Sequence, residues 1–187
     1  NVCDIYIHTW DRLEADSSYR KLSTELQNNT ITEEIIRNYI DAKDIIIETQ
    51  DKTMLKGKNS PESFGGTKKF GASCYGNKFV YYALKRAYTV AKEEDYDYVV
   101  RIRPDLYNIP YVTEHNIEKM ITYMKNDNTT KCMTGLTFYP GFPLGDNLYY
   151  MRFDEFSIFI NYMIDNFDNI NRYGQKVCSE AYINKFI

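Results

Sequence analysis

A strand is predicted at Tyr98-Val99-Val100-Arg101-Ile102, and Arg103-Pro104-Asp105 follows it directly. β-Branched and aromatic residues favour an extended chain, and the period of two in a strand places Arg101, Arg103 and Asp105 on the same side. Pro104 cannot donate a hydrogen bond to a sheet, so it marks the exit of the strand. Two cations and a carboxylate are therefore expected at a strand end, where open α/β sheets bind their ligands. The alternative is a salt-bridged strand terminus that binds nothing.

Helix and strand patterns alternate around this segment. Apolar residues recur at helical spacing through 77–94, and apolar runs at Val2–His8 and Lys43–Thr49 predict two further buried strands. The other expected elements are helices at 16–28, 32–41, 114–125, 153–167 and 177–186, strands at Lys131–Leu136 and Leu148–Met151, and a long polar loop at 50–73. This alternation predicts an α/β fold, a three-layer α/β/α sandwich around a mostly parallel sheet. The strands at Ile5–Ile7, Ile45–Ile47 and Val99–Ile102 are expected to be parallel neighbours.

Composition narrows the classes of function. The 187 residues suit one domain, expected over 1–187, and the net charge of −3 argues against binding to nucleic acid or to anionic membranes. The four cysteines are too dispersed for a zinc cluster or a disulfide scaffold. The chain has no run of about 18 apolar residues and no signal-peptide pattern, so we expect no membrane span and a cytoplasmic location.

Three more segments carry candidate residues for binding a ligand. The first strand leads into His8-Thr9-Trp10-Asp11, which would meet the Arg101–Asp105 segment at one sheet edge if the strands are parallel. Core packing is the alternative for His8 and Trp10. Asp146 lies in the glycine-, proline- and aromatic-rich loop 135–147, which suits stacking on a sugar or simple apolar packing. Lys68 lies in a glycine-rich segment that lacks the P-loop pattern, so a solvated loop is the simpler interpretation.

The order of these motifs resembles small nucleotide-sugar glycosyltransferases of the GT-A fold, which build bacterial surface polysaccharides and the capsid glycans of large algal viruses. The matching segments are residues 4–11, the helix 77–94, Tyr98 to Leu106, Gly145 to Tyr150, and Ser179-Glu180-Ala181-Tyr182. Members of this group begin with a further strand and a Gly/Arg-containing turn, so we expect the chain to lack that first strand. A viral member would work in the host cytoplasm.

The resemblance implies transfer of a hexosyl or deoxyhexosyl group from a nucleotide-diphosphate donor, with UDP-sugar favoured, to a glycan or glycoprotein acceptor. Asp105 matches the last acid of the motif that holds a divalent metal, Mn²⁺ or Mg²⁺, in GT-A enzymes. Arg103 stands where that motif has its first acid, so Arg101 and Arg103 could themselves neutralise part of the diphosphate charge. Asp146 is the candidate base. The donor-binding candidates are Arg101, Arg103, His8, Thr9, Trp10, Asp11 and Lys68. Two rival functions are a non-catalytic glycan-binding module and a metal-dependent phosphoester hydrolase.

Overall fold

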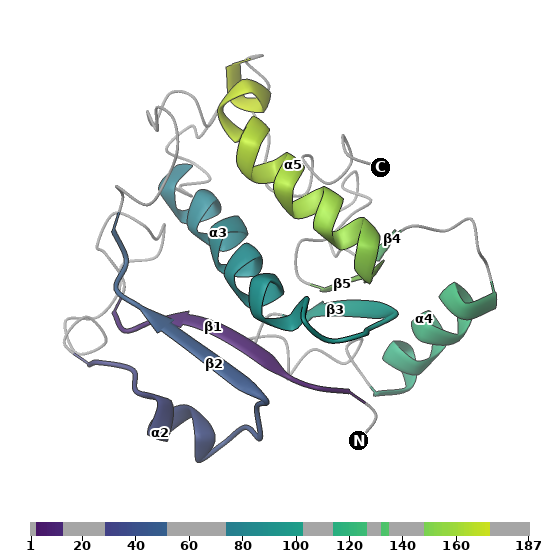
Figure 1. The fold of residues 1–187 in the computed structure, drawn as a ribbon, viewed down its shortest axis with the longest axis horizontal. Helices are drawn as coiled ribbons and strands as arrows, with labels where there is room; N and C mark the ends of the chain where they lie inside the picture. The colour runs from purple at the N-terminus through teal and green to yellow at the C-terminus, as the bar shows by residue number, and fades with distance from the viewer. Residues whose placement is uncertain are drawn as a thin grey trace. The chain divides into compact units, whose positions relative to one another are not determined.

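The computed structural model describes residues 3–12, 29–51, 74–102, 114–126, 132–134 and 148–172. Helices and strands alternate in these ranges, so the class is mixed α/β as predicted (Figure 1). The elements are β1 (Tyr6–Trp10), α2 (Glu33–Arg37), β2 (Asp44–Glu48), α3 (Cys74–Ala91), β3 (Tyr98–Ile102), α4 (Glu114–Asn126), β4 (Cys132–Thr134), β5 (Leu148–Arg152) and α5 (Phe153–Arg172). The expected helices at 16–28 and 177–186 and almost all of the loop 50–73 lie outside the described residues.

Contacts along the chain define two compact units, and each is described by itself. The first contains β1, α2, β2, α3 and the part of α5 from Ile160 onward. The second contains β3, α4, β4, β5 and the first turns of α5. The expectation of one domain over 1–187 stays a prediction.

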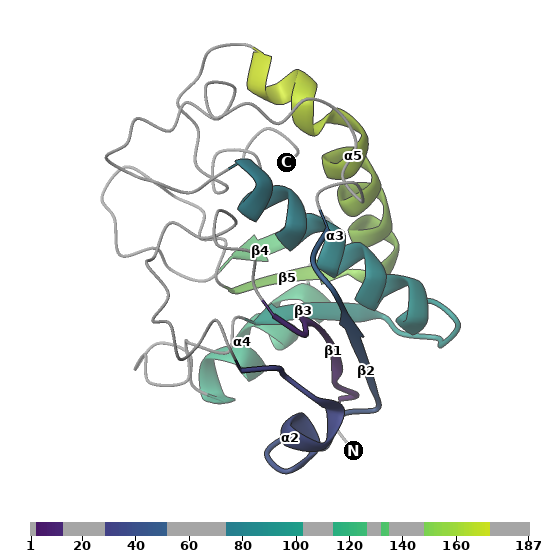
Figure 2. The ribbon, with the colours of Figure 1, turned by 90° about the vertical axis from the view of Figure 1, so that its left-hand side faces the viewer.

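The first unit is built on a parallel pair of strands, β1 and β2. Tyr6 lies opposite Asp44 and Trp10 opposite Glu48, so the carboxyl ends of the two strands coincide (Figure 2). This confirms the parallel arrangement expected for these two strands. The first strand covers Tyr6–Trp10 and not Val2–His8, so Thr9 and Trp10 belong to the ladder instead of following it.

Side chains on the two faces of this pair follow from the register. Because alternate residues point to opposite faces, His8, Trp10 and Glu48 share one face, and Thr9 and Ile47 share the other. Every residue of β2 is partly exposed, and so are the first four residues of β1. The pair is therefore less buried than its apolar sequence predicts.

Helix α3 covers the face that carries His8 and Trp10. The Trp10 ring lies 5.1 Å from the Phe79 ring and 5.8 Å from the Tyr82 ring, centre to centre. Phe79, Tyr82 and Arg86 follow one another at i, i+3 and i+7, which is one stripe of a helix. The position of α3, three residues earlier than the predicted 77–94 at both ends, leaves this stripe intact.

Helix α2 is shorter than the predicted 32–41. Thr32 caps its first turn by accepting a hydrogen bond from the Ile35 amide at 3.3 Å. Arg37 donates to Glu33 at 2.6 Å and to the Ala42 carbonyl at 2.9 Å. The helix buries none of its residues, so it lacks the packing that usually extends a short helix.

The second unit has a three-stranded sheet in the order β3-β5-β4, and both of its pairings are antiparallel. Strand β3 occupies the predicted residues, but its partner is β5, with Tyr98 opposite Arg152 and Ile102 opposite Leu148. In the described part of the chain no ladder joins β3 to β1 or β2. The single parallel sheet of three neighbours is therefore not what the structure shows, because strand partners are set by distant segments and not by the local apolar run.

Helix α5 begins directly after β5, and the Phe153 amide donates to the Asp97 carbonyl at 3.0 Å. Its fully or almost fully buried side chains are spaced i, i+3, i+4 and i+7 along one stripe: Phe156, Phe159, Ile160 and Met163. No helix within the described ranges has both the length and the apolar composition needed to cross a membrane.

Candidate functional site

The most developed polar cluster of the first unit surrounds His8 in the middle of β1. The His8 side chain is only 2% exposed. Its ring meets the Trp10 ring edge-on at 4.7 Å and the Tyr82 ring at 6.1 Å, centre to centre. The imidazole therefore lies in a mostly aromatic environment beneath α3.

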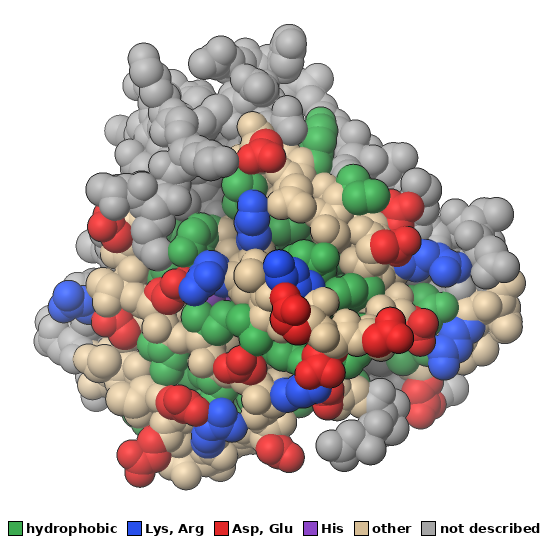
Figure 3. Space-filling view, in the orientation of Figure 1, with side chains coloured by type: hydrophobic (Ala, Val, Ile, Leu, Met, Phe, Trp, Pro, Cys, Tyr) green, Lys and Arg blue, Asp and Glu red, His purple; other side chains and the backbone are tan. Residues whose placement is uncertain are grey.

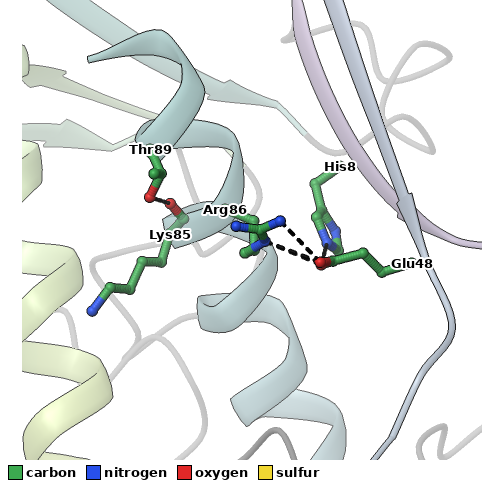
Figure 4. Close-up of polar contacts among 5 residues, drawn as sticks. All are labelled: His8, Glu48, Lys85, Arg86 and Thr89. Carbon is green, nitrogen blue, oxygen red and sulfur yellow. Dashed lines mark hydrogen bonds and ion pairs between the residues drawn. The ribbon is translucent and has the colours of Figure 1, made fainter. Parts of the chain in front are cut away.

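Glu48 of β2 is the shared acceptor of this cluster (Figure 4). His8 Nε2 lies 2.8 Å from Glu48 Oε2. Arg86 of α3 reaches the same carboxylate, with Nε 3.1 Å and a terminal guanidinium nitrogen 3.0 Å from Oε1. We call His8, Glu48 and Arg86 the His–Glu–Arg cluster. It ties β1, β2 and α3 to one carboxylate.

Burial and neighbouring charges shift the pKa values of three side chains here, those of His8, Glu48 and Tyr82. Burial lowers the pKa of His8, against the hydrogen bond and charge of Glu48, and the charge of Arg86 lowers it further. Burial raises the pKa of Glu48, but the hydrogen bonds and charges of His8 and Arg86 outweigh it, so the net shift is downward. Burial, followed by the charge of Glu48, raises the pKa of Tyr82. At neutral pH the cluster therefore holds a carboxylate, a guanidinium and a neutral imidazole.

The hydrogen-bond pattern assigns the tautomer of His8. An ionised carboxylate only accepts hydrogen bonds, so Nε2 carries the proton and donates to Glu48. Nδ1 then presents a lone pair, and this atom is buried with no hydrogen-bond partner among the described residues.

Asp11 fastens the carboxyl ends of β1 and β2. Its amide donates to the Glu48 carbonyl at 3.0 Å, and its carboxylate accepts from the Thr49 hydroxyl at 2.9 Å. The carboxylate also accepts from the Arg12 amide at 2.7 Å, and the Asp11 carbonyl accepts from the Ile31 amide at 2.8 Å. The residue predicted to line a donor site thus holds together the strand ends where such a site would open.

The structure brings four of the predicted donor-binding residues together in the first unit: His8, Thr9, Trp10 and Asp11. Trp10 is 8% exposed, and Phe79 and Tyr82 pack on its ring, so little of the ring is left for a sugar or a base. Thr9 lies on the opposite face of the pair. Contact between any of the four and a donor stays a prediction.

The Arg101–Asp105 motif begins inside the second unit. Arg101 lies in β3, partly buried and opposite Tyr149 of β5. Arg103, Asp146, Lys68 and the proposed metal ligand, Asp105, lie outside the described residues. Within the described ranges no three His, Cys, Asp or Glu side chains gather as a metal site would require. The metal site and the catalytic base therefore stay predictions from the sequence.

Glu48 and Arg86 were not anticipated from the sequence as partners of His8. A weak signal exists, since Glu48 ends an apolar strand and Arg86 interrupts the apolar stripe of α3. Recognising Glu48 and Arg86 as partners required the register of the strands and the orientation of the helix about its axis.

On the face drawn in Figure 3, acidic and basic side chains of the described residues are interspersed, and no large patch of one sign is seen.

A scan against protein-family models, a search of curated proteins and a search of solved structures each returned no match to the chain.

Proposed function

We propose that the chain is a glycosyltransferase of the GT-A type, which moves a sugar from a nucleotide-diphosphate donor, with UDP-sugar favoured, to a glycan or glycoprotein acceptor. The mixed α/β class and the parallel β1–β2 pair are compatible with this fold. The fold and the activity both rest on the sequence resemblance.

The observation that carries the proposal is the placement of Arg101. Its strand, β3, runs over Tyr98–Ile102 and leads directly into Arg103-Pro104-Asp105. Arg101 is partly buried in a strand that is otherwise apolar and aromatic. A guanidinium at a strand end can bind a diphosphate through charge-assisted hydrogen bonds whose geometry matches its planar donors.

The chain's own residues take three roles in the proposed reaction. Arg101 and Arg103 offset the negative charge that grows on the departing diphosphate. Asp146 accepts the proton of the acceptor hydroxyl as that oxygen attacks the anomeric carbon. Asp105 holds the divalent cation, Mn²⁺ or Mg²⁺, which when bound supplies further positive charge at the diphosphate.

The test is an assay of the whole chain with a panel of UDP-, GDP- and dTDP-sugars, with Mn²⁺, Mg²⁺ or a chelator. Release of the nucleoside diphosphate that depends on an added glycan acceptor is expected for at least one donor. Asp105→Ala should abolish transfer and Asp146→Asn should abolish transfer while the donor still binds, both with an unchanged circular dichroism spectrum.

Two results would overturn the proposal. Binding of glycans without binding of any nucleotide-sugar would favour the glycan-binding module. Metal-dependent release of phosphate from simple phosphoesters, with no sugar transfer, would favour the hydrolase.

A further inference from the structure

We propose that the His–Glu–Arg cluster is a proton-responsive joint, through which mild acidification loosens helix α3 from the β1–β2 pair. This inference does not depend on the proposed glycosyltransferase activity, because it is argued only from contacts and charges within the first unit and from no bound donor. It rests on where the three side chains come from and on the charge that they hold.

The joint is the polar link in a mainly aromatic interface. Glu48 accepts from β1 through His8 at 2.8 Å and from α3 through Arg86 at 3.0–3.3 Å. Tyr82 of α3 also makes a side-chain hydrogen bond with Glu48, and the rings of Phe79 and Tyr82 pack on Trp10. The carboxylate of Glu48 is therefore the point where polar bonds join all three elements.

A count of charges gives the direction of the response. With His8 neutral, the carboxylate of Glu48 and the guanidinium of Arg86 balance. Protonation of His8 adds one positive charge, and the cluster then holds two cations against one anion. The added charge sits on a side chain that is 2% exposed, where water screens it little.

The groups that face His8 come from each element packed against it. Glu48 comes from β2, and Tyr82 and Arg86 come from α3. Glu48 favours the charged ring, whereas burial and Arg86 disfavour it, and the net effect lowers the pKa of His8 below its ordinary 6.5. Tyr82 stays neutral in acid, because its pKa is raised from 10.0. No other titratable side chain of the described residues has a recorded contact with the ring.

Linkage then fixes the sign of the effect. An opened state, in which α3 has left the sheet and water reaches His8, binds the proton near pH 6.5, whereas the closed state binds it only at lower pH. Acid therefore favours opening. Between pH 7.5 and 5.5 the opening constant should rise by up to about tenfold, the limit set by one proton taken up by the open state alone.

The test is amide hydrogen exchange of the whole chain at pH 7.5 and 5.5, read by mass spectrometry and corrected for the intrinsic pH dependence of exchange. Peptides from β1 and α3 should lose protection together at pH 5.5, by several-fold to about tenfold, while β3–β5 peptides change much less. Equal protection of β1 and α3 at the two pH values would overturn the proposal.

Two histidine variants separate this joint from a general effect of acid. Gln can donate to Glu48 from a position close to that of Nε2 but does not titrate, so His8→Gln should keep protection at pH 7.5 and lose the pH response. His115→Gln is the matched control and should behave as the wild type. A response that persists in His8→Gln would contradict the proposal.

Arg86 offers an independent test that does not change the histidine. In Arg86→Gln the cluster carries a charge of −1 with His8 neutral, and protonation brings it to zero, so the pKa of His8 should rise and the response to acid should be smaller than in the wild type, with burial of His8 still acting. If His8→Gln fails to fold, this variant and an NMR titration of His8 in the wild type decide the matter. An ordinary or raised pKa for His8 in the folded wild type would refute the joint.

Discussion

The Thr49 hydroxyl donates to the Asp11 carboxylate at 2.9 Å and thereby closes the carboxyl end of the β1–β2 pair. The same carboxylate also accepts a hydrogen bond from the amide of the next residue, Arg12. Side-chain bonds of this kind hold strand ends in register at the edge where α/β folds recruit ligands.

Thr49→Val should therefore lower the free energy of unfolding by about 0.5–1.5 kcal/mol, the usual net contribution of one hydrogen bond. Urea unfolding measures the change. Thr89→Val is the control: both hydroxyls are exposed, but that of Thr89 donates at 2.8 Å to the carbonyl of Lys85 within the same helix and joins no separate segments. Its removal should cost less than about 0.5 kcal/mol, apart from the propensity of valine in a helix. Equal losses in the two variants would show that the Asp11–Thr49 bond stabilises nothing beyond the local chain.

Glu48→Ala should be the more damaging of two glutamate truncations. It leaves the buried donor of His8 and the guanidinium of Arg86 without their common acceptor, at a cost of about 2–4 kcal/mol. Glu33→Ala removes an ion pair with Arg37 in which both side chains are more than 40% exposed, at a cost of about 0.5 kcal/mol or less. Denaturant unfolding of both variants tests the contrast, and comparable losses would contradict it.

The stability of the first unit should depend on the ionisation of Glu48. The pKa of this carboxyl is lowered in the folded chain, so its contribution is present above the ordinary value of 4.5 and is lost as pH falls toward the folded value. The free energy of unfolding, measured from pH 7 downward, should fall more steeply below pH 4.5 in the wild type than in Glu48→Gln. Parallel curves for the two proteins would show that the carboxylate gains nothing from its partners.

Arg101→Ala and Arg103→Ala should each weaken the binding of the preferred nucleotide-sugar by about 10- to 100-fold, since a charge-assisted contact with phosphate contributes about 1.5–3 kcal/mol. Calorimetric titration with Mn²⁺ and with a chelator measures the effect. If Arg103 substitutes for the first metal ligand, Arg103→Ala should also become more dependent on Mn²⁺ than the wild type. Lys119→Ala, an exposed cation of α4, is the charge-matched control and should bind the donor normally. Unchanged affinity in both arginine variants would mean that these arginines pair with neighbouring acids of the protein.

Local sequence was sufficient to predict strands and helices that are determined mainly by their own residues. The β-branched runs at Ile45–Ile47 and Val99–Val100 form strands, and the apolar spacing from Phe79 onward forms α3. Local sequence could not predict which strands pair, because the choice of β5 as the neighbour of β3 depends on residues some fifty positions away. The predicted length of α2 was also wrong: its apolar stripe predicted a longer helix, but none of the residues of α2 is buried against the rest of the protein.

The candidate site shows the same division. His8 could be named from its place beside an apolar strand, but its acceptor Glu48 is 40 residues distant and emerges only from the parallel register. Trp10 packs against rings of α3, the alternative that its sequence context left open, and no pattern within β1 could name these ring partners.

Glu48 receives its two partners from opposite directions along the chain, one 40 positions before it and the other 38 positions after it. Both contacts require closure of long loops, an entropic cost that precedes any gain and slows folding. During synthesis, at about 5–20 residues per second, Arg86 is added about 2–8 s after Glu48. Until Arg86 has been added, Glu48 lacks its guanidinium partner, so the polar contacts that join the two strands to α3 can form only after α3 has been made.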